Sequence, residues 1–192
     1  MPSMRKIGNV DVSALKAQID AHPELWNANE MRTRMFADSP HREVDDIWLR
    51  CNAWENFNPE NPGSFADEHK SVDYPALDLL TSAREIIKRL LNNGDELGVI
   101  LLTRIPPGKQ VYPHSDAGRW HSEYYETKVL VLVQSHEAQA FVFMKDEIDP
   151  LQQAYYGEAG DVFEFNNHVM HAVYNNSNID RISLIAAVRR KI

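Results

Sequence analysis

The hydrophobic pattern of the chain changes near Glu96, and this change constrains the fold more than any other feature. From there on, short segments rich in Val, Ile, Leu and aromatic residues alternate with clusters of Pro, Gly, Asn and Asp. Such segments are typical of β-strands. They are LGVILLTRI, KQVYPH, TKVLVLVQ, AQAFVFMK, GDVFEFN, VMHAVYN and RISLIAAVR. Because no helical pattern separates them, they predict a β-sandwich or jelly roll and not a β-α-β sheet.

The part of the chain before this β-region predicts two helices with strand and loop between them. The segment DVSALKAQIDA has apolar residues at helical spacing, with Asp11 or Ser13 as N-cap. The segment ALDLLTSAREIIKRLLNNG predicts one longer helix that ends near Gly94. Its apolar stripe is Leu79, Leu80, Ala83, Ile86, Ile87, Leu90 and Leu91. Between the helices, VDDIWLRCNAW predicts one or two strands and NFNPENPGSFADEHK an exposed loop.

The length and composition favour a single globular domain over residues 1–192. We expect residues 1–95 to decorate a β-core formed by 96–192. A net charge of −8, with no basic cluster beyond the terminal RRKI, disfavours nucleic acid as a partner. The only cysteine, Cys51, cannot form an internal disulfide, and neither a signal-peptide pattern nor a run of about eighteen apolar residues is present. We therefore expect a cytoplasmic protein with no membrane partner.

The stretch VYPHSDAG contains the first candidate metal ligands. On a strand, His114 and Asp116 face the same way at a backbone separation of about 7 Å, so both side chains can reach one ion. An imidazole nitrogen and a carboxylate oxygen suit a divalent transition metal, and a third ligand completes the set found in non-haem Fe(II) oxygenases. The alternative is a solvated His beside a solvated Asp.

Two candidates for the third ligand, His168 and His171, lie in the segment GDVFEFNNHVMHAVYNNSNIDR. On a strand these two histidines face opposite sides. His171 shares its face with Val169 and Val173, which we expect to look inward. We therefore choose His171, and the alternative assignment for His168 is a packed or surface histidine.

Arg181 follows the turn-rich segment NNSNID, which predicts a hairpin that returns Arg181 alongside the strand of His171. A guanidinium in a barrel interior needs an anionic partner, and its planar fork fits a carboxylate. Ser183 shares the face of Arg181, so this face could hold a small dicarboxylate. The other face can pack on the helices; it carries Ile182, Leu184, Ala186 and Val188. The alternative is a salt bridge from Arg181 to Asp161, Asp180 or Glu164.

The segments PPGKQVYPHSDAG and GDVFEFNNHVMHAVYNNSNIDRISLI resemble the two signature regions of the aspartyl/asparaginyl β-hydroxylase family. These regions read G-x-x-(V/I)-x-P-H and F-(D/N)-(D/N)-x-x-x-H-x-V-x-N-x-(S/T) followed by Arg. The resemblance covers about the last half of the chain. Before Leu97 it is limited to HREVDDIWLR and an amino-terminal helical region. Animal members have Gly where this chain has Asp116, so we expect a full ligand triad.

The resemblance implies a mainly β protein with flanking helices, a double-stranded β-helix of the jelly-roll, cupin-like kind. It implies Fe(II) bound by His114, Asp116 and His171. It also implies 2-oxoglutarate as cosubstrate with O2, its distal carboxylate bound by Arg181. Further candidates for cosubstrate binding are Ser183 and Lys128. The implied reaction hydroxylates an amino-acid side chain, in a protein, a peptide or a free amino acid, with release of succinate and CO2.

Trp120 and Tyr124, in AGRWHSEYYETK, are candidates to line the substrate entrance, with simple packing as the alternative. Two other functions compete with the oxygenase. One is a cupin-like metalloprotein on the same barrel, and the other is a metal-free ligand-binding module. Arg181 distinguishes the oxygenase from the cupin, and iron content distinguishes both from the third. The pattern does not define an oligomeric state.

Overall fold

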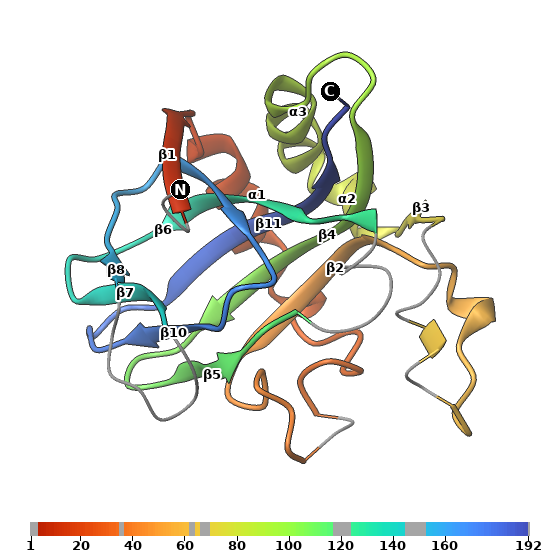
Figure 1. Ribbon diagram of the computed structural model, residues 1–192, viewed down its shortest axis with the longest axis horizontal. Coiled ribbons are helices and arrows are strands. Elements are labelled where there is room, and N and C mark those ends of the chain that lie inside the picture. Colours follow the sequence, from red (N-terminus) through yellow and green to blue (C-terminus); the bar gives the residue numbers. More distant parts are fainter. Residues whose placement is uncertain are drawn as a thin grey trace.

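The computed structural model describes residues 4–34, 37–61, 64–65, 70–116, 124–144 and 153–191. These residues form two antiparallel sheets that face each other (Figure 1). The seven-stranded sheet has the order β1 (Met4–Asn9), β9 (Asp161–Asn166), β6 (Thr127–Gln134), β11 (Arg181–Arg189), β4 (Glu96–Ile105), β2 (Asp45–Cys51) and β3 (Val72–Asp73). The four-stranded sheet has the order β5 (Gln110–His114), β10 (His171–Asn175), β7 (Gln139–Phe143) and β8 (Gln153–Tyr155).

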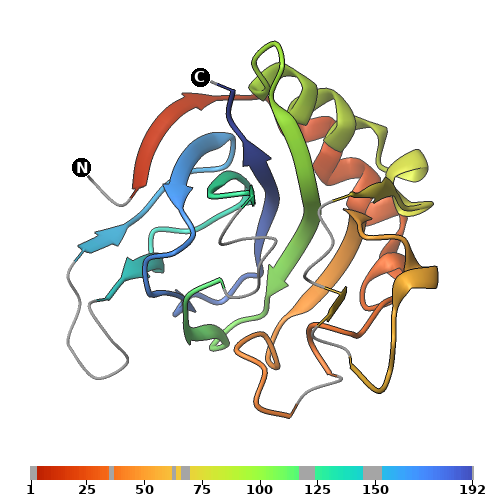
Figure 2. The same ribbon diagram turned by 45° about the vertical axis from the view of Figure 1, so that its right-hand side comes forward.

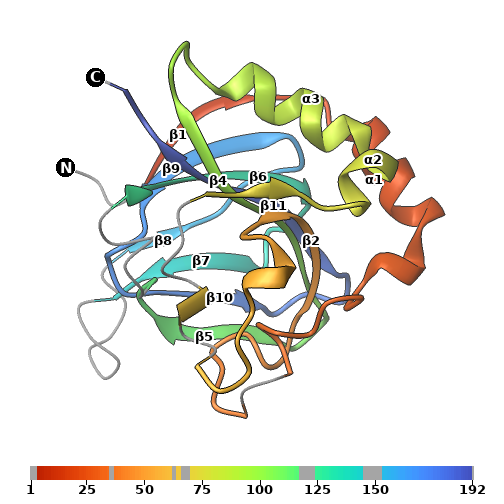
Figure 3. The same cartoon turned by 90° about the vertical axis from the view of Figure 1, so that its right-hand side faces the viewer.

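The helices cover the outer face of the larger sheet. They are α1 (Ser13–Ala21), α2 (Ala76–Leu79) and α3 (Thr81–Leu90). Figures 2 and 3 show α1 and α3 on one side of this sheet and the smaller sheet on its other side. Because side chains alternate along a strand, β11 packs Ile182, Leu184, Ala186 and Val188 against the helices. The expected division of the two faces of β11 is therefore observed.

A second core fills the space between the two sheets. It is rich in aromatic side chains: Phe141 and Phe143 from β7 meet Phe163 and Phe165 from β9, with Leu130 from β6 beside them. Burial of side chains of this size contributes about 1.5–3 kcal/mol each. Apolar side chains therefore fill this part of the space between the sheets.

The predicted mainly β jelly roll with flanking helices is confirmed. Each of the seven predicted β-segments contains a strand, and the segment VDDIWLRCNAW contains β2. The sequence did not reveal β1, β3 or β8, which lack the clear alternation of the others. The larger sheet takes β1, β2 and β3 from the first 95 residues, so this part of the chain contributes directly to the sheet.

The single long helix predicted over ALDLLTSAREIIKRLLNNG was wrong, because the chain forms two helices with a break at Leu80. The backbone of Leu80 has φ −103° and ψ 55°, outside the helical region. The break turns Leu80 fully into the core, with 0% exposure, and leaves Leu79 45% exposed. Leu79 therefore does not belong to the apolar stripe.

Two further features concern the cysteine and the lengths of the helices. The Cys51 side chain is buried, and burial raises the pKa of its thiol to about 12. Among the residues that the structure describes, no helix is both long and apolar enough to cross a bilayer.

The break between α2 and α3 predicts unequal effects of the same substitution at neighbouring positions. Leu80→Ala should lower the free energy of unfolding by about 2–5 kcal/mol, because it leaves a cavity in a filled core. Leu79→Ala should change it by no more than about 0.5 kcal/mol, because the side chain is largely in solvent. Urea unfolding of both variants measures the difference. Equal losses would show that the stripe is continuous and would contradict the break.

Candidate metal and cosubstrate site

Two strands of the smaller sheet bring the predicted histidine ligands together. His114 ends β5, His171 begins β10, and the antiparallel register places them opposite each other. Their ring centroids lie 4.4 Å apart. Asp116 follows just beyond β5, where its backbone N–H donates to the carbonyl of Asn167 (3.1 Å). The strand pairing therefore brings together residues that are far apart in the sequence.

The three side chains offer a suitable donor set for a metal ion. One ligand atom from each of His114, Asp116 and His171 lies within 4.8 Å of the others, and His114 Nε2 lies 3.9 Å from Asp116 Oδ1. Each histidine Nδ1 is 2.8 Å from a backbone carbonyl, that of Tyr112 or Val169. A carbonyl only accepts, so Nδ1 carries the hydrogen and Nε2 keeps the lone pair for a metal. Two imidazoles and one carboxylate fit ferrous iron.

The surroundings keep these imidazoles neutral. Burial, followed by the nearby His171, lowers the pKa of His114 to about 4. Burial also lowers the pKa of His171. A histidine must be neutral to bind a metal, so both are in the required form at neutral pH. Lys128 Nζ lies 2.5 Å from Asp116 Oδ2, which orients the carboxylate and directs Oδ1 toward His114.

Of the two histidines considered for the third ligand, only His171 lies in this cluster. It is 4% exposed and its ring packs among Phe141, Phe143 and Phe165. His168 lies in the turn before β10 and is exposed, with its backbone N–H on Asn166 Oδ1 (2.8 Å). The metal role of His171 is part of the function proposed below.

Arg181 lies on the inner face of β11 and is 5% exposed. Its Nη1 donates to Ser183 Oγ at 2.6 Å, and no carboxylate within the described part of the chain pairs with it. The carboxylates considered as alternatives have other positions or partners: Asp161 pairs with Lys6, and Glu164 pairs with Arg5 and Arg190. Burial lowers the pKa of Arg181 to about 10, so the group stays charged at neutral pH. This buried charge needs an anion.

The predicted hairpin between the strands of His171 and Arg181 was wrong. β10 and β11 lie in different sheets, so the connection crosses from one sheet to the other. Asn175 holds this crossing: its Nδ2 donates to the carbonyls of Ile105 (2.7 Å) and Ile179 (2.8 Å). Arg181 consequently faces the smaller sheet across the interior.

A small cavity beside Arg181 contains a group that the sequence did not reveal. Its lining includes Tyr155 and Leu132. The Tyr155 hydroxyl is buried and has no hydrogen-bond partner in the described residues. A buried hydroxyl without a partner is costly, so a ligand that reaches Arg181 could accept a hydrogen bond from Tyr155 as well. The three-residue strand β8 gave no signal for this role.

A third imidazole, His41, lies against His114, with ring centroids 4.7 Å apart and an interplanar angle of 76°. Burial, followed by the nearby charge of Arg32, lowers the pKa of His41 well below its usual value. The sequence contained this residue in HREVDDIWLR, but no spacing rule connected it with the H-x-D motif. Only the folded chain brings it to the site.

Trp120 and Tyr124 were the two residues predicted to line the substrate entrance. Trp120 lies outside the described residues. Tyr124 donates its hydroxyl to Glu96, and the guanidinium of Arg189 lies 4.2 Å from its ring centroid. These contacts place Tyr124 where β11 ends and β4 begins, so its role toward a substrate remains a prediction.

Three solved structures share this fold over nearly the whole chain. An oxidoreductase of the 2OG-Fe(II) oxygenase family from Burkholderia pseudomallei aligns with 98% of this chain and 86% of its own, at 13% identity and TM-score 0.59. A viral collagen prolyl hydroxylase from Paramecium Bursaria Chlorella virus-1 aligns over 98% and 97%, at 12% identity and TM-score 0.53. A Pseudomonas putida prolyl-4-hydroxylase aligns over 98% and 92%, at 17% identity and TM-score 0.51. At these identities the likeness concerns the fold.

The sequence comparison goes further than the fold. No curated protein sequence matches the chain. Residues 19–191, however, match the family model described as Aspartyl/Asparaginyl beta-hydroxylase. This match includes both signature segments and also most of the amino-terminal part, where the resemblance seen in the sequence was limited. The chain therefore belongs to the aspartyl/asparaginyl β-hydroxylase family.

Proposed function

We propose that the protein is an Fe(II)- and 2-oxoglutarate-dependent dioxygenase that hydroxylates an amino-acid side chain. In this proposal His114, Asp116 and His171 bind iron, and Arg181 binds the distal carboxylate of 2-oxoglutarate. The family membership supports hydroxylase activity. The donor set of two neutral imidazoles and one carboxylate supports the choice of metal.

The buried guanidinium of Arg181 is the observation that carries the cosubstrate assignment. A fully buried charge is costly unless it is paired, and within the described residues its only hydrogen-bond partner is Ser183. A carboxylate matches both the charge and the planar fork of a guanidinium. Ser183 and Tyr155 lie where their hydroxyls can complete the contact. A cupin-like metalloprotein would have no need of this charge.

The chain provides binding, orientation and exclusion of water. The aromatic side chains between the sheets enclose the inner side of the site, which strengthens ionic contacts there. Lys128, first considered for the cosubstrate, contacts Asp116 and could set the direction of the metal-binding oxygen. When bound, iron and 2-oxoglutarate supply the oxidation, in which O2 converts a substrate C–H bond to C–OH while 2-oxoglutarate becomes succinate and CO2.

We propose an amino-acid side chain as the substrate, in a protein, a peptide or a free amino acid. Support comes from the family, whose description names aspartyl and asparaginyl groups.

Removal of either histidine ligand should abolish iron binding. We expect anaerobic protein with Fe(II) and 2-oxoglutarate to show a metal-to-ligand charge-transfer band that is absent in His114→Ala and His171→Ala. Admission of air should then yield succinate only from protein that shows the band.

His168→Ala is the matched control, because it removes an exposed histidine three positions from His171. It should keep the band and its intensity. A band that survives in His171→Ala but is lost in His168→Ala would reverse the assignment. Iron uptake without any effect of 2-oxoglutarate would instead favour the cupin-like alternative.

Arg181→Ala should weaken 2-oxoglutarate binding by about 100-fold, because charge-assisted hydrogen bonds are lost. Tyr155→Phe should weaken it by about fivefold, because only one neutral hydrogen bond is lost and the ring remains. Titration of the charge-transfer band with 2-oxoglutarate measures both effects.

Tyr174→Phe provides the control for this series, since Tyr174 lies on β10 beside Val173 and faces away from the space between the sheets. Its affinity should equal that of the wild type. Wild-type affinity in Arg181→Ala would remove the basis for the cosubstrate site.

A further inference from the structure

His41 belongs to a segment that is fixed along the edge of the smaller sheet. The backbone N–H of Tyr112 on β5 donates to the carbonyl of Pro40 at 2.9 Å. The guanidinium of Arg42 lies 3.5 Å from the centroid of the Tyr112 ring. These contacts lie on either side of His41 and hold its ring against His114. Because β5 is the edge strand, this segment completes the wall of the site there.

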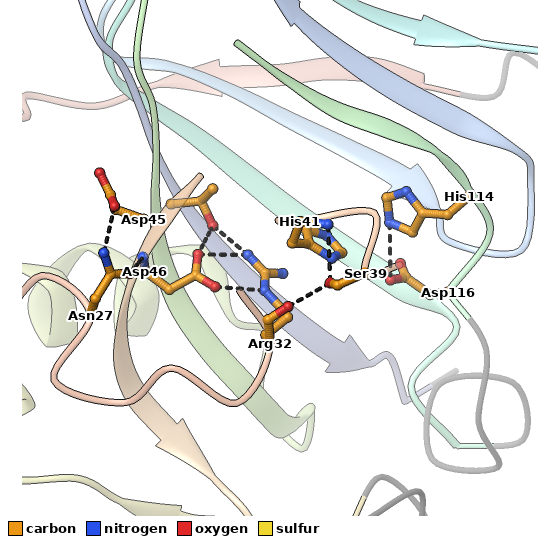
Figure 4. A network of polar contacts seen from close by, with 9 residues as sticks. Asn27, Arg32, Ser39, His41, Asp45, Asp46, His114 and Asp116 are labelled. Carbon is orange, nitrogen blue, oxygen red and sulfur yellow. Dashed lines mark hydrogen bonds and ion pairs between the residues drawn. The ribbon is translucent and has the colours of Figure 1, made fainter. Parts of the chain in front are cut away.

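A buried ionic network around Arg32 and Asp46 holds the segment of His41 through Ser39, on its amino-terminal side (Figure 4). Ser39 Oγ donates to the carbonyl of Arg32 at 2.5 Å. Arg32 donates through Nε and Nη2 to the carboxylate of Asp46, both at 2.7 Å, and through Nη2 to Thr103 Oγ1 at 2.8 Å. Asp46 is 0% exposed. Loss of one partner of such a pair costs about 3–5 kcal/mol, so the network fixes the approach to His41 firmly.

This network is continuous with the sheet that carries the proposed cosubstrate site. The strand registers pair Asp46 with Thr103 and Thr103 with Ser183, so the three residues form one row across β2, β4 and β11. Ser183 in turn accepts the hydrogen bond of Arg181. The position of His41 is therefore set by the same row of residues that positions the proposed carboxylate site.

The ring nitrogens of His41 are uncommitted, unlike those of the proposed ligands. His114 and His171 each use Nδ1 to bond a carbonyl. Neither ring nitrogen of His41 forms a hydrogen bond within the described ranges, although the ring is only partly exposed and contacts a proposed metal ligand. An imidazole held beside the proposed metal site can donate one hydrogen bond to a molecule bound there, or accept one from it.

We propose that His41 is a further residue of the active site, and that its ring forms a hydrogen bond to a water molecule in the exchangeable position of the metal. This inference rests on the proposed function. Such a hydrogen bond would hold the water in place and would thereby delay the access of O2 until substrate arrives. His41 would thereby limit consumption of 2-oxoglutarate without product.

The test compares two substitutions that separate the hydrogen bond from ring packing. His41→Phe keeps a planar ring against His114 and removes both nitrogens, whereas His41→Gln keeps a side chain that can form the hydrogen bond. Near-infrared magnetic circular dichroism of the anaerobic Fe(II)·2-oxoglutarate protein distinguishes five-coordinate from six-coordinate iron. We expect six-coordinate iron in the wild type and in His41→Gln, and a mixture with five-coordinate iron in His41→Phe.

Succinate formation in air without added substrate is the second measurement. It should rise about fivefold in His41→Phe, as expected for the loss of one hydrogen bond, and remain near the wild-type rate in His41→Gln. His41→Ala should also raise the basal rate of succinate formation and the share of five-coordinate iron. This variant tests the same loss of a hydrogen bond if the Phe side chain does not fit at position 41. His168→Phe, at an exposed position, should change neither measurement.

The outcomes separate the two proposals. If wild-type protein shows no charge-transfer band with iron and 2-oxoglutarate, the proposed function fails and the role of His41 fails with it. If the band forms but His41→Phe and His41→Ala both keep six-coordinate iron and the wild-type basal rate, only the role of His41 is overturned. If His41→Gln behaves like His41→Phe, ring packing and not a hydrogen bond explains the effect, and the proposal is again overturned.

Discussion

The antiparallel register between β5 and β10 is the constraint on which the site depends. A slip by one residue would turn His171 to the other face of the sheet and separate it from His114. The register is fixed beyond the strands by reciprocal backbone bonds: Gly108 N–H donates to the Asn175 carbonyl (2.8 Å), and Asn175 N–H donates to the Lys109 carbonyl (3.0 Å). Gly108 has φ +71°, a conformation that favours glycine. The turn at Gly108 therefore fixes one end of the pairing, and a register shift between His171 and Val173 brings His171 opposite His114, the other proposed metal ligand.

Charge is distributed unevenly over the interior. On the outer face of the larger sheet, a buried cluster of apolar side chains packs on the helices. On the inner face, Arg181 and Asp46 are buried, yet only Asp46 has a partner of opposite charge in the described residues, namely Arg32. Burial of Asp46 is thus balanced within the fold, whereas burial of Arg181 favours the entry of an anion. This difference separates the structural ion pair of Asp46 from the proposed binding site at Arg181.

The sequence predicted the elements better than their connections. Periodicity located the strands of the β-core, because alternation reports directly on which face is buried. It did not show that β10 and β11 lie in different sheets, since a turn-rich segment suits a hairpin and a crossing equally well. It also extended one helix through Leu80, because an apolar stripe does not report a local change in backbone angles.

Some residues of the candidate site could be selected from the sequence, and others were found only in the structure. The H-x-D motif, His171 and Arg181 could be selected from the sequence because their types and order resemble a known pattern. Tyr155 and His41 could not, because one lies on a three-residue strand and the other in a loop, and neither position has a periodic signal.

The sequence by itself determined the alternation of apolar and polar residues and the identity of the groups able to bind a metal and an anion. Only the tertiary structure decided which of these groups meet. Strand register, sheet crossing and the burial of an unpaired charge arise from contacts between distant segments, and no local pattern contains them.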